Sequence, residues 1–278
     1  MSVQCSICQN KDRVILEDSA LNLYKCDSCL HSFSNIPEDK KEPYCESYFL
    51  ETHKNWFNNP DYGLFAFLYK IILKYTDKER FKLLDAGCGK GDFLKYLKNT
   101  DPKIELHGID LIHNQCSGIN FSKGDILKDE IRGKFDVILS LVTIEHIDQP
   151  HLFIKKLKNA LLPNNLLLIT TINSNSMCYR TARLLNKIGV TTPYNRFYSP
   201  HHTQHYTNTS LRALMELNDF TVILQRNHNY HLKGVDFPKG NFLKRCIYAL
   251  GIWIFFSFST IFKDGMLQTI VCRKNSER

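Results

Sequence analysis

The chain has 278 residues and a mass of 32.4 kDa, and its 36 Lys and Arg against 28 Asp and Glu give a formal charge of +8. Hydrophobic residues make up 43% and charged residues 23%, which excludes a disordered or collagen-like chain. The length allows one large domain with a small attachment, or two modest domains. No basic segment followed by an apolar run opens the sequence, so we expect a cytoplasmic protein whose ten cysteines stay reduced.

The positive charge is concentrated in the last part of the chain. Residues 1–80 carry 10 basic and 12 acidic side chains, residues 81–170 carry 12 and 11, and residues 171–278 carry 14 and 5. A local positive field suits an anionic partner, which can be a phosphate-bearing substrate, an acidic membrane surface or nucleic acid. A basic surface that is only solvated explains the same charge. Nucleic acid is the least favoured partner, because long Lys and Arg runs and RNA-binding motifs are absent from the sequence.

Two Cys-x-x-Cys pairs lie near the beginning of the chain. Cys5 and Cys8 form the first pair, and Cys26 and Cys29 form the second. Four thiolates at this spacing predict one tetrahedral zinc ion. A closed set of four sulfur ligands leaves no open position, so we expect a structural metal that stabilises a segment too short to fold alone. The arrangement resembles a zinc ribbon over residues 1–35. Two disulfides or four free thiols are the alternative.

A glycine-rich loop separates a predicted strand from a predicted helix. The apolar residues Phe81, Leu83 and Leu84 are typical of a buried strand, and residues 92–99 have helical periodicity. Three glycines between them permit a tight turn that approaches a ligand closely: Gly87, Gly89 and Gly91. Strand, turn and helix predict the start of a nucleotide-binding βαβ unit. Asp92 takes the place of the third glycine of the dinucleotide motif, and an acid at that helix N-terminus repels pyrophosphate. A cofactor with a cationic end and no phosphate fits better.

The segment from Asp85 to Gly91 resembles motif I of the class I S-adenosylmethionine-dependent methyltransferases, Asp-x-Gly-x-Gly-x-Gly. Further landmarks of that family follow in order over residues 80–170. The resemblance implies an α/β fold with a Rossmann-like sheet of seven strands. In this family one acid binds the ribose hydroxyls and another holds the adenine amino group, which implies these roles for Asp110 and Asp125. The implied cofactor-binding residues are Asp85, Gly87, Gly89, Gly91, Asp110, Asp125 and Glu145.

Residues 171–206 are rich in Asn, Thr, Tyr and His, and we expect this long segment to form a substrate lid. If a hydroxyl is methylated, a base has to take its proton, and neutral imidazole does so near pH 7. The candidates are His205, which we prefer, His146 and His202; each could instead only line the rim. Some ubiquinone-pathway O-methyltransferases hold a metal on Glu-x-x-Glu-His. Here Val142 replaces the first carboxylate, so a catalytic metal is not expected.

The stretch from Cys246 to Phe262 contains no charged residue. Its basic flanks are Lys244, Arg245 and Lys263. As a helix it would be about 25 Å long, which is shorter than the hydrocarbon core of a bilayer. Strands predicted at 220–225 and 266–272 pair antiparallel in this family, and a single membrane crossing between them would separate them. Two interpretations remain: a helix buried against the sheet, or an amphiphilic helix at the membrane surface.

These patterns together predict a domain organisation and a reaction. We expect a zinc ribbon at 1–35, a helical connector at 36–78 and a methyltransferase domain at 79–278, with an apolar helical insertion at 227–262. The expected reaction is methyl transfer to a small or lipid-linked acceptor, including a sugar nucleotide or surface-glycan precursor, with peripheral contact at the inner face of the membrane. An RNA methyltransferase is a second hypothesis, which the slightly acidic residues 1–80 disfavour. A scaffold that binds the cofactor without turnover is a third.

Overall fold

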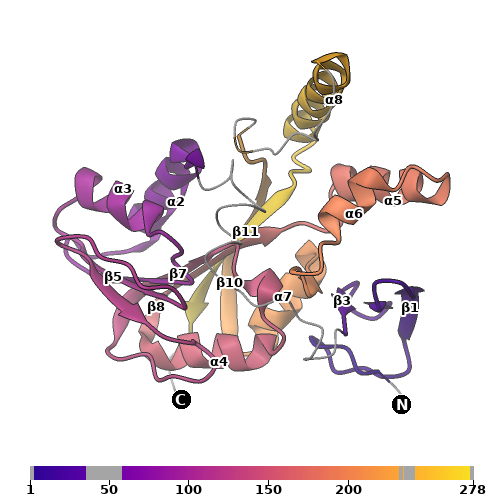
Figure 1. Ribbon diagram of the computed structural model, residues 1–278. Helices are drawn as coiled ribbons and strands as arrows, with labels where there is room; N and C mark the ends of the chain where they lie inside the picture. The colour runs from indigo at the N-terminus through magenta and orange to yellow at the C-terminus, as the bar shows by residue number, and fades with distance from the viewer. Residues whose placement is uncertain (1–2, 36–57, 232–233, 235–241, 276–278) are drawn as a thin grey trace.

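The computed structural model describes residues 3–35, 58–231, 234 and 242–275. Seven strands form the central sheet: β4 (Lys82–Ala86), β5 (Glu105–Asp110), β6 (Asn120–Lys123), β7 (Phe135–Leu141), β8 (Leu161–Ile172), β10 (Phe220–His228) and β11 (Leu267–Lys274). Their order is β10-β11-β8-β7-β4-β5-β6 (Figure 1). The strands from β6 to β8 pair in parallel, and β11 lies antiparallel between β8 and β10. The predicted seven-stranded α/β sheet is confirmed, including its antiparallel last pair.

Helices cover both faces of this sheet. On one face lie α2 (Tyr62–Tyr75) and α3 (Asp92–Thr100), and on the other lie α4 (Pro150–Ala160) and α7 (Asn208–Leu217). Successive strand residues serve opposite faces: Leu83 packs with α2 and α3, whereas Leu84 packs with α4 and α7. A strand that is buried on both faces needs apolar side chains at successive positions, as in Leu83–Leu84 of β4 and Val137–Leu139 of β7.

Two turns use residues other than glycine in the left-handed conformation. Asn164, in the turn before the long part of β8, has φ 59°, as its short polar side chain permits. Asp219 follows α7 with φ 59° at the position where the resembling family usually has glycine.

The N-terminal segment forms a second, smaller sheet. Its strands are β1 (Val14–Asp18), β2 (Leu23–Cys26) and β3 (Ser32–Ser34), joined by β9 (Gln204–His205). The pairs β1–β2, β2–β3 and β3–β9 are all antiparallel. The fourth strand therefore comes from the far end of the predicted lid, so the ribbon sheet and the lid share hydrogen bonds.

The predicted lid and the apolar insertion both differ from the expectation. Residues 171–206 form two helices, α5 (Met177–Lys187) and α6 (Thr192–Phe197), before they reach β9. The apolar stretch forms α8 (Phe242–Ile261), which projects from the body (Figure 1). Trp253 is 57% exposed and Ile261 is 72% exposed, so the interpretation of a helix buried against the sheet is wrong. Among the described residues, the structure contains no helix with the length and apolarity that a membrane crossing requires.

The predicted connector at 36–78 is only partly described. Residues 36–57 lie outside the described residues, and α2 forms most of the rest. Asp61 caps this helix, since its Oδ1 accepts a hydrogen bond of 2.9 Å from the Leu64 N–H. The cap places the start of α2 beside the carboxyl end of β4, where the pocket described below opens.

Candidate functional site

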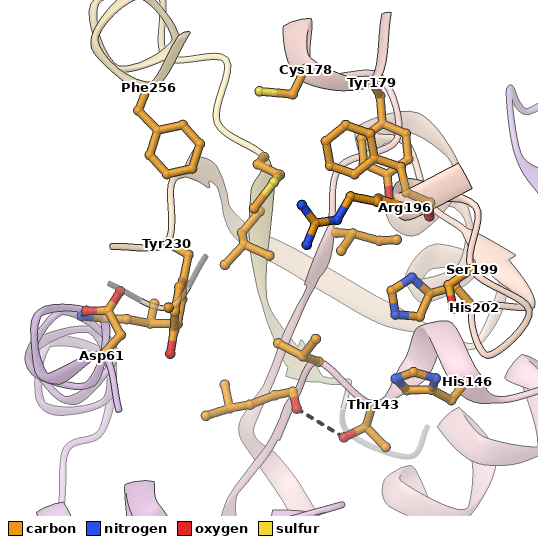
Figure 2. Close-up of a pocket in the computed structure, with 18 of the residues that line it drawn as sticks. Asp61, Thr143, His146, Cys178, Tyr179, Arg196, Ser199, His202, Tyr230 and Phe256 are labelled. Atoms are coloured by element: carbon orange, nitrogen blue, oxygen red, sulfur yellow. Dashed lines mark hydrogen bonds between the residues drawn. The ribbon is translucent and has the colours of Figure 1, made fainter. Parts of the chain in front are cut away.

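A pocket of about 730 Å³ lies at the carboxyl ends of the parallel strands (Figure 2). Its floor is formed by the glycine loop after β4 and by the ends of β7 and β8. Its walls are formed by the start of α2, by α5 and α6, and by α8 with the start of β11. Ligands of open α/β sheets bind at this edge, where loops from neighbouring strands diverge. The fold therefore builds the pocket where the resembling family binds its cofactor.

The glycine loop is a tight turn, as its sequence predicts. Gly87, Gly89 and Gly91 have φ values of 80°, 52° and 72°, which favour glycine. A Cβ on Gly87 would collide with the side chain of Thr143, and one on Gly91 would lie 2.6 Å from the ring of Phe121. Only the absence of side chains at these positions lets the loop pack this closely. Gly87 and Gly89 line the pocket.

Asp110 lies at the end of β5, behind the glycine loop. Its Oδ2 accepts a hydrogen bond of 2.8 Å from the Gly89 N–H, and its Oδ1 accepts one of 3.1 Å from the Ile112 N–H. Burial raises the pKa of this carboxyl, although these backbone donors oppose the shift. Asp110 holds the loop in place and does not itself line the pocket. Its role on the ribose stays a prediction.

Asp85 is the acid that faces the pocket from the end of β4. Its side chain is only 2% exposed, and its Oδ1 has no hydrogen-bond partner among the described residues. Burial, together with the nearby Asp110 and Asp92, raises the pKa of Asp85 to about 8. A buried carboxyl without a partner fits a ligand with a cationic group, which would compensate its charge. S-adenosylmethionine has this chemistry in its ammonium and sulfonium groups.

Two other predicted cofactor residues have local partners and do not line the pocket. Asp125 accepts a hydrogen bond of 2.9 Å from the Leu127 N–H, which stabilises a turn after β6. Glu145, in the 3-10 helix Ile144–His146, is buried and accepts a hydrogen bond of 2.8 Å from the Thr171 hydroxyl. Burial raises the pKa of Glu145 to about 7. Glu145 thus joins the loop after β7 to β8, and its role towards the cofactor stays a prediction.

The three candidate histidines lie in different environments. His146 and His202 line the pocket, with ring centroids 4.9 Å apart. The His146 Nδ1–H donates a hydrogen bond of 2.8 Å to the His201 carbonyl, which leaves the lone pair of the neutral ring on Nε2. His205 is fully buried against Tyr198 and does not line the pocket, and burial lowers its pKa to about 3. Its placement does not support our preference for His205, whereas His146 and His202 line the pocket, and the identity of the base stays a prediction.

The four predicted metal ligands come together in one cluster. The sulfur atoms of Cys5, Cys8, Cys26 and Cys29 all lie within 4.8 Å of one another, and the 5–29 and 8–26 pairs are each 3.5 Å apart. These distances exceed a disulfide bond and approach the spacing of about 3.8 Å in a tetrahedral site with bonds of about 2.3 Å. The hydrogen bond from Cys29 lowers the pKa of Cys5 to about 4, which favours a thiolate. The residues fit a structural zinc ion.

Polar contacts connect this cluster to the lid. His31 is fully buried, and its Nε2–H donates a hydrogen bond of 2.9 Å to Gln204 on β9. The Ser6 hydroxyl donates a second hydrogen bond of 2.8 Å to the same amide oxygen. His31 Nδ1 lies 3.3 Å from the Ser210 hydroxyl in the first turn of α7. Gln204, two residues after the pocket residue His202, is therefore hydrogen-bonded to Ser6 and His31 of the segment that contains the four cysteines.

Sequence reasoning missed much of the pocket wall. The wall includes Asp61 and Tyr230 on one side, Arg196 on α6, and Phe255 and Phe256 on α8 (Figure 2). The apolar run of α8 predicted either a buried helix or a membrane contact, and gave no sign that two of its rings line a pocket. Arg196 lies inside the predicted lid, where a single arginine carries no local signal.

The sequence comparison agrees with this geometry. Residues 58–225 match the profile of a family described as a methyltransferase domain. The chain belongs to this methyltransferase family. Together with motif I, the seven-stranded sheet and the pocket at its carboxyl edge, the match makes the protein a class I S-adenosylmethionine-dependent methyltransferase.

Similar proteins include O-methyltransferases. A ubiquinone biosynthesis O-methyltransferase of Rickettsia typhi is 24% identical over 208 residues, which cover 64% of this chain and 83% of that protein. A malonyl-[acyl-carrier protein] O-methyltransferase of Calditerrivibrio nitroreducens is 30% identical over 115 residues, which cover 40% of this chain and 46% of that protein.

Solved structures show the same fold. A SAM dependent methyltransferase from Archaeoglobus fulgidus aligns with a TM-score of 0.53 and 18% identity. The alignment covers 82% of this chain and 100% of that protein's chain. Phosphoethanolamine N-methyltransferase 2 of Haemonchus contortus, in complex with S-adenosyl-L-methionine, has a TM-score of 0.55 and 13% identity over 84% of this chain and 58% of its own. At these identities the likeness concerns the fold alone.

Proposed function

We propose that the methyltransferase acts on a hydroxyl oxygen of an amphiphilic, lipid-linked acceptor. The observation that carries this proposal is the division of the pocket. Thr143, His146 and His202 form a polar wall, whereas Phe255 and Phe256 belong to an apolar wall. Transfer to oxygen is supported by the names of the similar O-methyltransferases. A sugar nucleotide is the less favoured acceptor, because its sugar and phosphates would leave the apolar wall unused.

The chain's own residues have separate tasks in this reaction. S-adenosylmethionine supplies an electrophilic methyl group when bound. Asp85 compensates the positive charge of the cofactor, and Asp110 keeps the glycine loop in shape. His146 takes the proton from the acceptor hydroxyl at Nε2, the nitrogen that its hydrogen bond to His201 leaves basic. The helices of the lid hold the acceptor in line and exclude water, so positioning contributes much of the rate.

We also propose that the acceptor is reached from a membrane surface. The helices α5 and α8 line the pocket with some side chains and expose apolar side chains elsewhere. Exposed examples are Leu184, Ile188, Leu250, Trp253, Ile254, Phe258, Ile261 and Phe262. Lys187 on α5 and Lys263 after α8 are exposed and suit anionic headgroups. An apolar patch with basic residues beside it is typical of peripheral binding to an anionic bilayer.

Transfer of labelled methyl groups tests the proposed acceptor. Purified protein and methyl-labelled S-adenosylmethionine are incubated with a cell extract, which is then separated into lipid, small-metabolite and RNA fractions. We expect label in the lipid fraction. Label confined to water-soluble metabolites would contradict the lipid-linked acceptor, label confined to RNA would support the RNA methyltransferase hypothesis, and no label in any fraction would support the scaffold. His113→Ala, an exposed histidine outside the pocket, serves as the control for His146→Ala.

A further inference from the structure

The three arginines of α5 and α6 differ in their partners. Arg180 forms a salt bridge of 2.6 Å with Asp264. Arg183 donates a hydrogen bond of 2.9 Å to the hydroxyl of Tyr198. Within the described part of the chain, the guanidinium of Arg196 makes neither a hydrogen bond nor a salt bridge, although Arg196 lines the pocket. Two of these charges therefore stabilise the lid, and the third is available to a ligand.

Arg196 is placed where a bound molecule would meet it. It lies in the last turn of α6, and Figure 2 shows its guanidinium directed into the pocket. Ser199 and His202 lie on the same side of the pocket. Phe256 on α8 and Met266 before β11 belong to the apolar lining. A ligand that touches both sides needs a polar group at one end and an apolar part at the other.

The charges that line the pocket are separated in space. The acids Asp61, Asp85 and Asp92 lie at the start of α2, at the end of β4 and at the start of α3, which is the side of the cofactor loop. Lys90 also belongs to that loop. Arg196 is the cation that the lid contributes to the lining among the described residues. Opposite charges at the two ends would orient a cationic cofactor towards the acids and an anionic acceptor towards the lid.

We infer that Arg196 binds an anionic group of the acceptor, a carboxylate or a phosphate, while α8 and the start of β11 hold its hydrocarbon part. The inference rests on the proposed methylation of an amphiphilic acceptor and deepens it by assigning the charge of that acceptor. A planar guanidinium matches two oxygens of either anion at once. Arg196 is exposed in the structure, so an acceptor without the anion would leave the guanidinium to water and would gain no charge-assisted hydrogen bond from it. Arg196 would therefore favour anionic acceptors over neutral ones.

Simple amphiphiles test this assignment without knowledge of the natural acceptor. Calorimetry measures the binding of octyl phosphate, octanoate and 1-octanol, which share one tail, and of inorganic phosphate, which has none. All titrations use the full chain saturated with S-adenosylhomocysteine. The variants are Arg196→Ala and Arg196→Lys. Lys155→Ala is the control, because it removes one positive charge from an exposed position of α4 that does not line the pocket.

We expect at least one octyl anion to bind about tenfold or more tightly than 1-octanol in the wild type and in Lys155→Ala. This ratio should fall to about one in Arg196→Ala and should be intermediate in Arg196→Lys. The two octyl anions distinguish a carboxylate from a phosphate, and weak binding of inorganic phosphate supports the role of the apolar wall. Equal binding of anions and alcohol, a preference that survives in Arg196→Ala, or no binding of either octyl anion would each overturn the inference.

The same titrations separate this inference from the proposed function. Binding of S-adenosylhomocysteine reports the cofactor site and the fold of each variant, and it should be unchanged in Arg196→Ala. If the wild type did not bind S-adenosylhomocysteine, the proposed methyl transfer would be refuted. Normal cofactor binding without an anion preference would refute only the role of Arg196. Inorganic phosphate that binds as tightly as octyl phosphate would overturn the assignment of the tail to α8.

Discussion

Asp85 shows how one residue links burial, pH and ligand binding. The ordinary pKa of an aspartate is 3.8, and burial raises that of Asp85 to about 8 in the folded protein. Between these two values the folded protein holds a proton that the unfolded chain has lost. The contribution of Asp85 to the free energy of unfolding therefore falls as the pH rises from about 4 to about 8. A bound cation stabilises the Asp85 carboxylate and so restores this lost free energy of unfolding.

Asp85→Asn should show how much the ionisation of this buried carboxyl destabilises the cofactor-free protein. The amide cannot ionise, so the cofactor-free variant should melt at a higher temperature than the wild type at pH 8, with a smaller difference at pH 5. Its affinity for S-adenosylmethionine should fall about tenfold or more at pH 8, since the charge pair is lost. Thermal unfolding with and without cofactor, together with calorimetry, checks both effects. A variant that binds the cofactor as tightly as the wild type would contradict the assignment of Asp85.

Single substitutions also test which histidine takes the proton from the acceptor. We expect His146→Ala to lower kcat about 100-fold or more with little change in cofactor affinity, because general-base catalysis typically contributes this factor. His113→Ala should leave both quantities unchanged. The measurement is single-turnover methyl transfer to the identified acceptor, next to calorimetry with S-adenosylhomocysteine. A large loss in His205→Ala with a normal rate in His146→Ala would restore our first preference and contradict this one.

At the scale of elements, β9 links the cysteine cluster to the pocket. It has two residues, and such a short strand has little stability without the sheet that it joins. Its partner β3 belongs to the segment that the four cysteines hold together. Since His202 lies two residues before β9, order in the ribbon should be transmitted to the polar wall of the pocket. A metal ion held by the four cysteines would thus position a part of the active site without touching the substrate.

Metal removal should therefore affect turnover more than cofactor binding. We expect about one zinc ion per chain, and Cys26→Ser should lose it and loosen the N-terminal sheet. Cofactor affinity should stay close to that of the wild type, whereas methyl transfer should fall, because β9 loses its partner. Metal analysis, calorimetry and turnover measure the three effects. Cys116→Ser, outside the cluster, is the control. A folded, reduced wild type without metal would refute the zinc site.

At the scale of the whole molecule, the apolar surfaces and the pocket lie together. Contacts join α5 and α8, and both helices contribute to the pocket wall. Both helices expose apolar side chains, with Ile188 at the end of α5 71% exposed and Ile261 on α8 72% exposed. Exposed apolar surface of this kind marks a site of interaction. A membrane surface there would present an amphiphilic acceptor beside the pocket.

We expect salt-sensitive binding to liposomes. The protein should sediment with anionic vesicles at low salt, less with neutral vesicles, and less at high salt, because each basic residue near an acidic surface contributes about 1 kcal/mol that salt screens. The double variant Trp253→Glu/Phe258→Glu should bind more weakly, whereas Leu217→Glu on α7 should not. Absence of binding to either vesicle would contradict the proposal. Binding that resists salt and alkaline carbonate would mean insertion, which the pairing of β10 with β11 opposes.

The sequence by itself determined the local parts of this protein. The glycine loop and the two Cys-x-x-Cys pairs are each encoded within a short segment, and the structure contains the tight loop and brings the four cysteines together. Local encoding is possible because strand periodicity, turn conformation and ligand spacing depend on neighbouring residues. Motif I, together with the landmarks that follow it over residues 80–170, predicted S-adenosylmethionine as the cofactor through the resemblance to the family.

Only the tertiary structure decided which residues share the pocket. The structure places His205 in the interior and His146 in the pocket lining, and the exposure of α8 excludes the buried helix proposed for the apolar stretch. The pairing of β3 with β9 joins residues that lie 173 positions apart, as Ser32 and His205 do, and no local pattern predicts it. Arg196 became a candidate only when its neighbours Arg180 and Arg183 proved to have partners. Hydrophobic periodicity reports that a side chain is covered, but which side chains meet depends on how distant segments pack.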